Sequence, residues 1–256
     1  MRGDLLLEGK TGIVFGVANK FSIAWAVAET AARHGAKVAI GYQDERMLDS
    51  VLALTEGNDS FRVYECDLNR DEQLAQLAED LRRDYEGLDF IVHSVAYARR
   101  EDMAGRFLDC SRDGFKVALE TSCFSFVACC HALEPLLCDG GSCLTMSYLG
   151  SSRVVPIYGI MGIAKAALES ATRYLAYDLG SRGIRVNALS PGPISTVAAR
   201  SIPGFSKMTS EAKERVPLST PVAQPEVADA ALFLLSDLSR GITGEVIFVD
   251  GGYHMV

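Results

Sequence analysis

The sequence predicts an α/β protein in which helices cover both faces of one doubly wound, parallel sheet. Short apolar runs alternate with longer stretches of helical periodicity along all 256 residues. The short runs are apolar at consecutive positions, which is typical of strands that are buried on both faces. No linker, repeat or low-complexity stretch interrupts the alternation. We therefore expect residues 1–256 to form a single domain with a Rossmann fold.

The strands and helices are expected in alternating order, with β-branched and aromatic residues in the strands and amphipathic spacing in the helices. One helix shows the spacing clearly, since Leu74, Leu77, Ala78 and Leu81 fall on one face. The predicted strands cover residues 11–15, 37–42, 61–65, 90–94, 142–147, 184–189 and 245–249, and the predicted helices cover 22–34, 71–85, 112–137 and 157–179.

Composition and charge exclude several classes of protein. With 48% hydrophobic residues and a mean hydropathy of +0.13, the chain is neither disordered nor fibrous. Its net charge of −8 opposes binding to phosphate backbones, so we expect no nucleic-acid partner. No uninterrupted apolar run reaches the ~18–20 residues of a membrane span, and the first residues do not resemble a signal peptide. We expect a soluble, cytoplasmic protein without a membrane partner.

The cysteines and histidines give no sign of a metal site or a disulfide framework. The seven cysteines are odd in number, include no CxxC, and lie mostly among apolar residues. The four histidines are scattered along the chain. We expect no metal, and we interpret the cysteines as small buried hydrophobes in a reducing compartment.

The junction between the first strand and the first helix is a candidate nucleotide site. Gly16 allows a tight turn at the end of the strand, and Ser22 suits the start of the helix, whose N–H groups would face a pyrophosphate. The usual G-x-G-x-x-G is absent, so a plain strand–turn–helix explains the segment equally well.

The ends of the second and third strands carry residues suited to an adenosine. Gln43 can bind ribose hydroxyls, and the next two residues, Asp44 and Glu45, would repel a 2′-phosphate, which favours NAD over NADP. Arg46 is an opposing feature. Asp67 follows the third strand and would either accept the amino hydrogens of adenine or cap the next helix, and both interpretations stay open.

Two residues of the last long helix are candidates for chemistry. Tyr158 and Lys165 are seven residues apart, which places them on one helical face. The lysine would bind ribose hydroxyls, and its charge would favour a phenolate or a polarised phenol on the tyrosine. Tyr148 ends a strand and would enter the same cleft. A packing tyrosine and a solvated lysine on an amphipathic helix are the alternative for the pair alone.

The residues around Tyr158 and Lys165 match the sequence pattern of a known family. The short-chain dehydrogenase/reductase signature is Ser-x12-Tyr-x3-Lys, but counting back from Lys165 places Met161 at its tyrosine and Tyr148 at its serine. The chain has Tyr148-x9-Tyr158-x6-Lys165 instead, and matching segments extend over nearly its full length. The chain thus resembles the triclosan-sensitive type of enoyl-[acyl-carrier-protein] reductase within that superfamily. The matching segments include Gly16-Val17-Ala18-Asn19, Ser22-Ile23-Ala24, Tyr42-Gln43, Cys66-Asp67-Leu68, His93-Ser94-Val95, Tyr148-Leu149-Gly150 and Gly192-Pro193-Ile194 with Thr196.

This resemblance implies NADH-dependent reduction of the trans-2 double bond of enoyl thioesters on acyl carrier protein, in the last step of fatty-acid elongation. NADPH is the less favoured cofactor. The catalytic residues implied are Tyr148, Tyr158 and Lys165. The cofactor-binding residues implied are Gly16, Ser22, Ile23, Gln43, Asp67, Leu68, Ser94, Val95, Lys165, Ile194 and Thr196. The substrate-binding residues implied are Ala98, Tyr148, Met161, Ala198, Ile202 and Phe205.

The displaced tyrosine has a chemical reason. Hydride reaches an enoyl thioester at C3, whereas negative charge collects on the carbonyl oxygen at C1. The phenol must therefore lie farther from the nicotinamide, and Tyr158 is about one helical turn, roughly 5 Å, from the usual position. Tyr158 would hold the enolate, Lys165 would anchor the ribose, and Tyr148 would pack near the thioester.

The resemblance also implies a substrate-binding lid at about 195–216, although a surface helix with a packed apolar face would explain the same residues. Pro203-Gly204 favours the lid because it would interrupt a helix. The family usually has more basic residues here, so docking of the acidic carrier is expected to be weaker or to use another patch.

The resemblance also implies a homotetramer, with interfaces from the apolar helices at 123–137 and 157–179.

Two other functions stay open at this stage. One is a carbonyl reductase of the same superfamily, which Met161 disfavours because a thioether transfers no proton. The other is a regulatory protein that binds NAD(P)H without turnover, which the presence of both Tyr158 and Lys165 disfavours.

Overall fold

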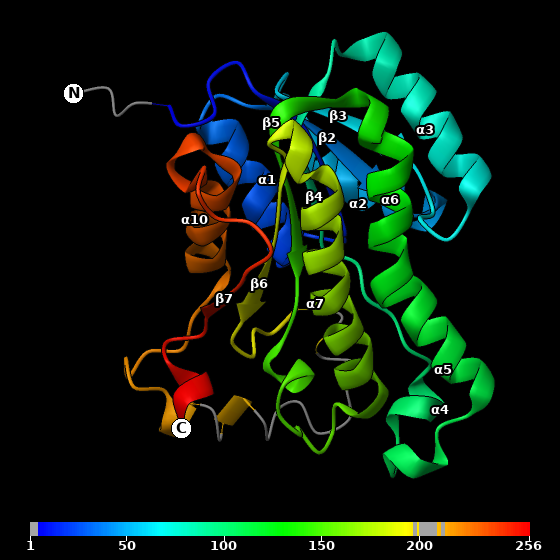
Figure 1. Cartoon of the computed structure of the whole chain (residues 1–256), viewed down its shortest axis with the longest axis vertical. Helices are drawn as coiled ribbons and strands as arrows, with labels where there is room; N and C mark the ends of the chain where they lie inside the picture. The colour runs from blue at the N-terminus through cyan, green and yellow to red at the C-terminus, as the bar shows by residue number, and fades with distance from the viewer. Residues whose placement is uncertain (1–4, 197–198, 200–208, 211–212) are drawn as a thin grey trace.

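The computed structural model describes residues 5–196, 199, 209–210 and 213–256. Its centre is a seven-stranded sheet in which every pair of neighbours is parallel, in the order β3-β2-β1-β4-β5-β6-β7 (Figure 1). The order reverses between β1 and β4, which is the switch point of a doubly wound sheet. The strands are β1 (Thr11–Phe15), β2 (Lys37–Tyr42), β3 (Phe61–Glu65), β4 (Leu88–His93), β5 (Leu137–Met146), β6 (Arg185–Pro191) and β7 (Val246–Val249).

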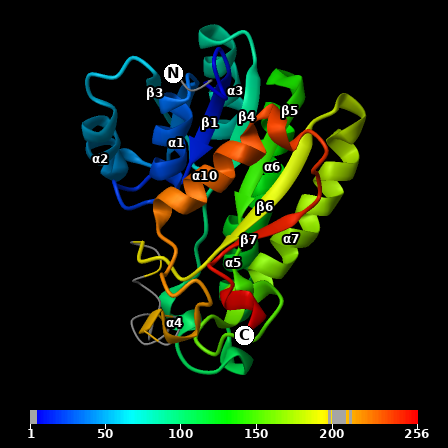
Figure 2. The same cartoon turned by 90° about the vertical axis from the view of Figure 1, so that its left-hand side faces the viewer.

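Helices cover both faces of this sheet, as the fold class requires. Figures 1 and 2 show α1 and α10 together on one face and α3, α6 and α7 on the other. The short helix α4 and the C-terminal residues lie beyond the carboxyl ends of the strands (Figure 1). The helices are α1 (Ile23–Arg33), α2 (Glu45–Thr55), α3 (Asp71–Asp84), α4 (Arg100–Met103), α5 (Arg112–Leu119), α6 (Ser125–Leu133), α7 (Gly159–Leu179) and α10 (Gln224–Leu235).

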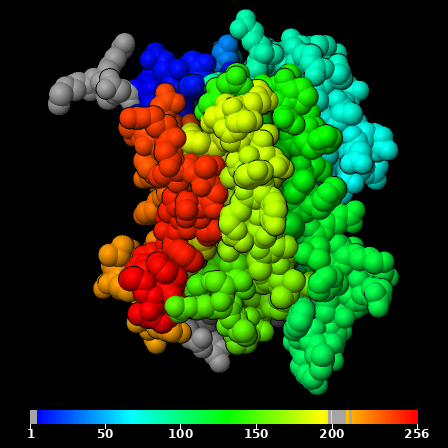
Figure 3. Space-filling model, viewed as in Figure 1, coloured from blue at the N-terminus to red at the C-terminus, as the bar shows by residue number. Residues whose placement is uncertain are grey.

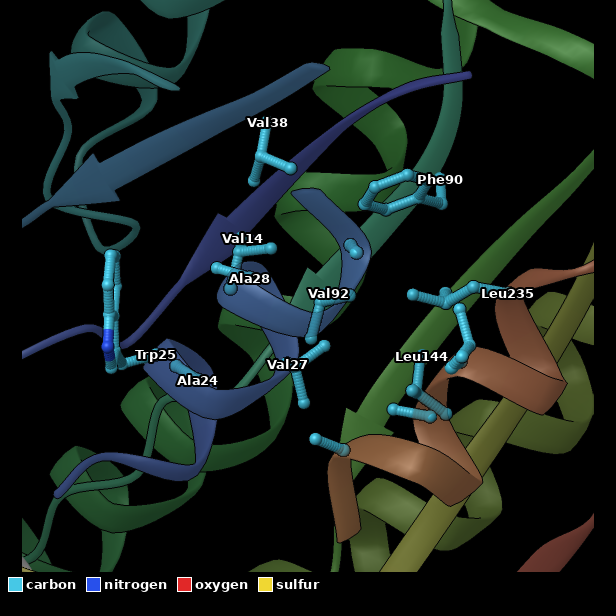
Figure 4. Packing of buried hydrophobic residues seen from close by; sticks show 14 of the residues in the cluster. Val14, Ala24, Trp25, Val27, Ala28, Val38, Phe90, Val92, Leu144 and Leu235 are labelled. Atoms are coloured by element: carbon cyan, nitrogen blue, oxygen red, sulfur yellow. The ribbon is translucent and has the colours of Figure 1, made fainter. Parts of the chain in front are cut away.

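Small residues let α1 approach the sheet closely. Ala24 and Ala28 are fully buried and face Val14 and Val92, while Leu235 brings α10 onto the same core (Figure 4). Burying apolar side chains contributes ~25 cal/mol for each Å² removed from water, so this packing fixes α1 at the switch point.

The opposite face has its own apolar core, and it contains four of the seven cysteines. Cys66, Cys129, Cys130 and Cys143 are buried there, whereas Cys138 is exposed. All seven cysteines are unpaired. The prediction of small buried hydrophobes is therefore confirmed for four cysteines and wrong for Cys138.

The predicted strands at 11–15, 37–42 and 61–65 agree with the structure residue for residue. The predicted helix at 112–137 is wrong in detail, because a π-helical turn at Glu120–Phe124 separates α5 from α6 and β5 begins at Leu137. Helices α2 and α10 were not predicted. The amphipathic repeat of α10 is weak, whereas α2 has a clear one that the prediction missed.

One helical stretch within the described residues, Arg112–Leu136, is long and apolar enough to cross a membrane by length and composition alone. Half of its most apolar window is buried, because α6 packs against α3, α7 and β5. A core helix passes the same test, and this packing makes it a core helix here.

Candidate active site

A cleft of about 1020 Å³ opens at the carboxyl ends of the strands, beside the switch point between β1 and β4. Ligands bind at this place in doubly wound sheets. Its wall extends from the end of β2 to the start of α7 and brings together most of the predicted site residues. Those lining it are Gly16, Ser22, Ile23, Gln43, Asp67, Leu68, Ser94, Val95, Ala98, Tyr148, Tyr158, Met161, Lys165, Ile194 and Thr196.

Position 16 requires a glycine because its backbone lies very close to the backbone of Ser94. Its φ is +98°, and a Cβ at this position would lie 2.1 Å from the carbonyl oxygen of Ser94 at the end of β4. Only glycine fits such a contact, so the turn after β1 can lie directly against the residue that follows β4. This is the backbone shape that a dinucleotide site needs, and it occurs here without G-x-G-x-x-G.

Ser22 takes a different role from the one expected. It is the N-cap residue of α1, but its Oγ accepts hydrogen bonds from the N–H groups of Ala18 and Asn19, at 3.0 and 3.1 Å. The side chain therefore stabilises the turn and leaves the first N–H groups of the helix uncapped. Those groups remain available to an anionic ligand in the cleft.

At the adenosine end, Asp67 is not a helix cap. Helix α3 begins at Asp71 with Arg70 as its N-cap, so the capping interpretation is wrong. The Asp67 carboxylate instead accepts hydrogen bonds from the backbone and side chain of Asn69, both at 3.0 Å, and lies 3.5 Å from Gln43 Nε2.

Arg46 is occupied by its neighbour Asp44. The carboxylate accepts from the Arg46 backbone N–H at 3.0 Å, which caps α2, and pairs with the guanidinium through Nε and Nη2. This pair lowers the pKa of the Asp44 carboxyl, with the guanidinium hydrogen bond as the largest cause. The guanidinium that could bind a 2′-phosphate is thus already paired with the Asp44 carboxylate.

The two tyrosines lie against each other at the other end of the cleft. The ring centroids of Tyr148 and Tyr158 are 4.7 Å apart, with 59° between the planes. Tyr158 is the N-cap residue of α7 rather than part of it, because Gly159 has a φ of +38° and begins the helix. The helix predicted at 157–179 therefore begins two residues later, at Gly159, but the side chains of Tyr158 and Lys165 both reach the cleft, as their spacing predicts.

Burial controls the protonation of this group. The pKa of Tyr158 is raised, first by burial and then by Tyr148, and the pKa of Tyr148 is raised mainly by burial. Of the two expected states, a phenolate and a polarised phenol, the raised pKa favours the phenol, which carries a proton and can donate a hydrogen bond. Burial lowers the pKa of Lys165 to about 8. Its Nζ donates a 2.7 Å hydrogen bond to the carbonyl oxygen of Met146.

An apolar pocket surrounds the tyrosines. Met161 occupies the tyrosine position of the superfamily signature and packs with Tyr148 and Tyr158, beside Ala98 and Ala199. The site therefore has no proton donor at that position. Three predicted substrate residues, Ala198, Ile202 and Phe205, lie outside the described residues, as does much of the predicted lid.

Sequence reasoning missed the hydrogen-bonded layer beneath the cleft. His93 is fully buried, with ring nitrogens 3.1 Å from Thr145 Oγ1 and 2.8 Å from Ser125 Oγ. Ser122, in the π-helical turn, bonds both backbone groups of Tyr97, at 2.9 and 3.0 Å. π-helical turns are frequent at functional sites, but the apolar periodicity of this segment gives no signal of one.

Within the part of the chain that the structure describes, no group of three or more His, Cys, Asp or Glu side chains is placed to hold a metal ion. The groups that face the cleft are the two phenols, the ammonium group of Lys165, the carboxylate of Asp67, backbone N–H groups and apolar side chains.

A glycine turn at the switch point, an uncapped helix N-terminus and a buried lysine beside a tyrosine define a nucleotide-dependent oxidoreductase of the short-chain type. Comparison with known proteins gives the particular family. The family model described as enoyl-(acyl carrier protein) reductase matches residues 16–254. The chain belongs to the enoyl-[acyl-carrier-protein] reductase family.

Individual relatives agree over almost the whole chain. The NADH-dependent enoyl-[acyl-carrier-protein] reductase of Bacillus cereus is 45% identical over 254 residues, which are 98% of this chain and 99% of the relative. The crystal structure of the Aquifex aeolicus enzyme superposes with a TM-score of 0.95 at 43% identity, covering 98% of both chains. That of the Anaplasma phagocytophilum enzyme in complex with NAD superposes with a TM-score of 0.93 at 40% identity, covering 100% of this chain and 96% of that one. The predicted family and fold are therefore confirmed.

Proposed function

We propose that this protein reduces the trans-2 double bond of enoyl thioesters on acyl carrier protein with NADH. The observation that carries this proposal is the pair Tyr148 and Tyr158 packed in the cleft, with Met161 at the position where a carbonyl reductase needs its phenol. The names of relatives at up to 45% identity support the same reaction and the same cofactor.

Tyr158 has the chemical state that the reaction needs. Because its pKa is raised by burial, its hydroxyl carries a proton and donates a hydrogen bond to the thioester carbonyl oxygen. That oxygen gains negative charge during reduction, and a donor inside an apolar pocket stabilises it more strongly than one in water. Tyr148 and Met161 pack along the acyl group and exclude water from the enolate.

Lys165 has the place and charge to hold a nicotinamide ribose. NADH, when bound, supplies the hydride that reaches C3 of the substrate. The glycine turn and the uncapped N–H groups of α1 suit its pyrophosphate, and Gln43 with Asp67 suits its adenosine. The Asp44–Arg46 pair favours NADH, although a crystal structure of the Bacillus cereus relative contains NADP+.

The remaining features are part of the same proposal. Residues 1–256 form one domain, with a lid at about 195–216 that covers the acyl chain, and Ala198, Ile202 and Phe205 contribute to that lid. The protein acts in the cytoplasm as a homotetramer, without a membrane or nucleic-acid partner. The exposed aromatic residues of α7 support self-association, and the net charge of −8 opposes binding to nucleic acid.

Consumption of NADH with a trans-2-enoyl thioester, on carrier protein and on coenzyme A, tests the reaction. We expect Tyr158→Phe to lower kcat/KM about 100-fold or more, because it removes one hydrogen-bond donor to the developing charge. Tyr85→Phe is the matched control, since it removes a hydroxyl at the end of α3, outside the residues that line the cleft. Cofactor binding without turnover would contradict the proposal, and undiminished reduction of ketones by Tyr158→Phe would favour a carbonyl reductase.

A further inference from the structure

The short segment after β5 connects both halves of the active site. Met146 ends β5, and its carbonyl oxygen accepts from Lys165 Nζ at 2.7 Å. Tyr148, two residues later, lies against Tyr158. The position of this segment therefore sets both the ammonium group and the tyrosine pair.

Ser147 holds that segment from two sides. Its backbone N–H donates to the carbonyl oxygen of Leu189 in β6, at 2.6 Å. Its buried Oγ donates a 2.5 Å hydrogen bond to Oε1 of Glu169, which lies one helical turn beyond Lys165 on α7. Bonds between a hydroxyl and a carboxylate are short and about twice as strong as neutral ones.

Resting on the proposed function, we infer that Glu169 is a positioning residue for the reductase. Through Ser147 it fixes the segment 146–148, whose Met146 carbonyl accepts from Lys165, and its carboxylate lies one helical turn from that ammonium group, so that the ammonium group is held ready for the cofactor ribose. No direct contact of Glu169 with substrate or cofactor is involved, since it is absent from the residues that line the cleft.

The electrostatic surroundings of Lys165 support this role. Burial lowers its pKa to about 8, while the charge of Glu169 acts in the opposite direction. The other titratable groups that face the lysine are Cys123 of the π-helical turn, which acts in the same direction as Glu169, and His93, which is neutral. Cys123 is the larger of the two raising causes, but burial raises the pKa of its own thiol, so the thiol is uncharged at neutral pH. Glu169 lies on the lysine's own helix, one turn beyond it.

The role of Glu169 predicts how NADH binding depends on pH. Glu169→Gln keeps an oxygen that can accept from Ser147 but removes the charge, so the lysine deprotonates at lower pH. We expect its affinity for NADH to be unchanged at pH 6.5, and the fall in affinity on raising the pH to begin about one pH unit earlier than in the natural protein. Ser147→Ala removes the hydrogen bond and is expected to weaken NADH binding about fivefold at every pH.

Titration of NADH fluorescence between pH 6 and 9.5 measures these dissociation constants, and thermal unfolding shows whether each variant is folded. Asp178→Asn is the matched control because it removes an exposed carboxylate from the same helix. A pH profile of Glu169→Gln that coincides with that of Asp178→Asn would overturn the inference. If the unaltered protein binds NADH but reduces no enoyl thioester, the proposed function fails while the inference about cofactor binding stands.

Discussion

At the scale of single residues, charge and burial decide what each functional side chain can do. The loss of water around both side chains keeps Tyr158 as a phenol and brings the pKa of Lys165 close to neutral pH. Desolvation disfavours the charged form of either group, so it raises the pKa of a tyrosine and lowers that of a lysine. The active site therefore holds a proton on Tyr158 and an easily titrated charge on Lys165.

Cofactor preference is also decided by single residues. Asp44→Asn keeps a side chain that caps α2 but loses the charge that pairs with Arg46. The freed guanidinium can then bind a 2′-phosphate. We expect the ratio of the NADPH dissociation constant to the NADH dissociation constant to fall about two- to fivefold, which is the effect of one exposed charge pair.

Fluorescence titration with both cofactors measures this ratio. Glu45→Gln is the control, since it removes the adjacent negative charge and leaves the Asp44–Arg46 pair intact. An equal shift of the ratio in the two variants would mean that overall charge, rather than the release of Arg46, sets the preference.

His93 predicts a dependence of stability on pH. Its pKa is lowered to about 3, mainly because it is fully buried, whereas in the unfolded chain a histidine titrates near 6.5. Below pH 6.5 the unfolded chain therefore takes up a proton that the folded protein does not. The free energy of unfolding falls by up to ~1.4 kcal/mol for each pH unit between 6.5 and about 3 from this group.

Urea unfolding at pH 7.5 and 5.0 measures this loss. We expect His93→Gln to lose about 2 kcal/mol less than the natural protein between these pH values, whatever its stability at pH 7.5. His131→Gln serves as the control because that histidine is exposed on α6. The same pH dependence in all three proteins would exclude His93 as the cause.

At the scale of elements, the turn between β1 and α1 joins fold and function. It must lie close against the end of the neighbouring strand β4, and it must leave the N–H groups of α1 open. Gly16 meets the first requirement and the Ser22 hydroxyl meets the second by bonding the turn instead of the helix.

Gly16→Ala tests this turn. We expect a loss of ~2–4 kcal/mol in the free energy of unfolding, from the positive φ and from contact with the Ser94 carbonyl, together with weaker NADH binding. Gly57→Ala is the matched control, since Gly57 has a φ of +71° but open space around the added methyl group. We expect ~1 kcal/mol there and unchanged NADH binding. Equal losses in both variants would show that the contact with Ser94 is unimportant.

At the scale of the whole molecule, the outward face of α7 is too apolar for water alone. Tyr174 and Tyr177 lie about three and four turns beyond Ile163, on the same side of the helix. The three side chains are 42% (Ile163), 72% (Tyr174) and 86% (Tyr177) exposed. Figure 3 shows α7 forming a continuous ridge at the surface between β7 and α6. Exposed aromatic residues in such a row are typical of an interface.

Tyr177→Glu tests the proposed homotetramer. We expect its mass by light scattering to fall below four times the 27.6 kDa of one chain, because a charge at the core of an interface is unfavourable. Leu238→Glu is the control, since that side chain is 60% exposed on another part of the surface. A natural protein of one-chain mass would contradict the tetramer outright.

The sequence by itself determined the sheet, the family and most of the cleft. The strands at 11–15, 37–42 and 61–65 were predictable because apolar runs and their breaks are local properties of the chain. The spacing of Tyr148, Tyr158 and Lys165 was equally readable, and all three line the cleft. Their catalytic roles stay predictions.

The tertiary structure decided what depends on partners far apart in the chain. Three features depend on local hydrogen bonds and backbone angles among which packing selects: the role of Ser22, the start of α3 after Arg70 and the start of α7 at Gly159. The protonation of Tyr158 and the contact between Ser147 and Glu169 depend on burial, which no local pattern encodes. Hydrophobic periodicity in the sequence specifies which face of a helix or strand is buried, but only the packed molecule specifies which residues that face contacts.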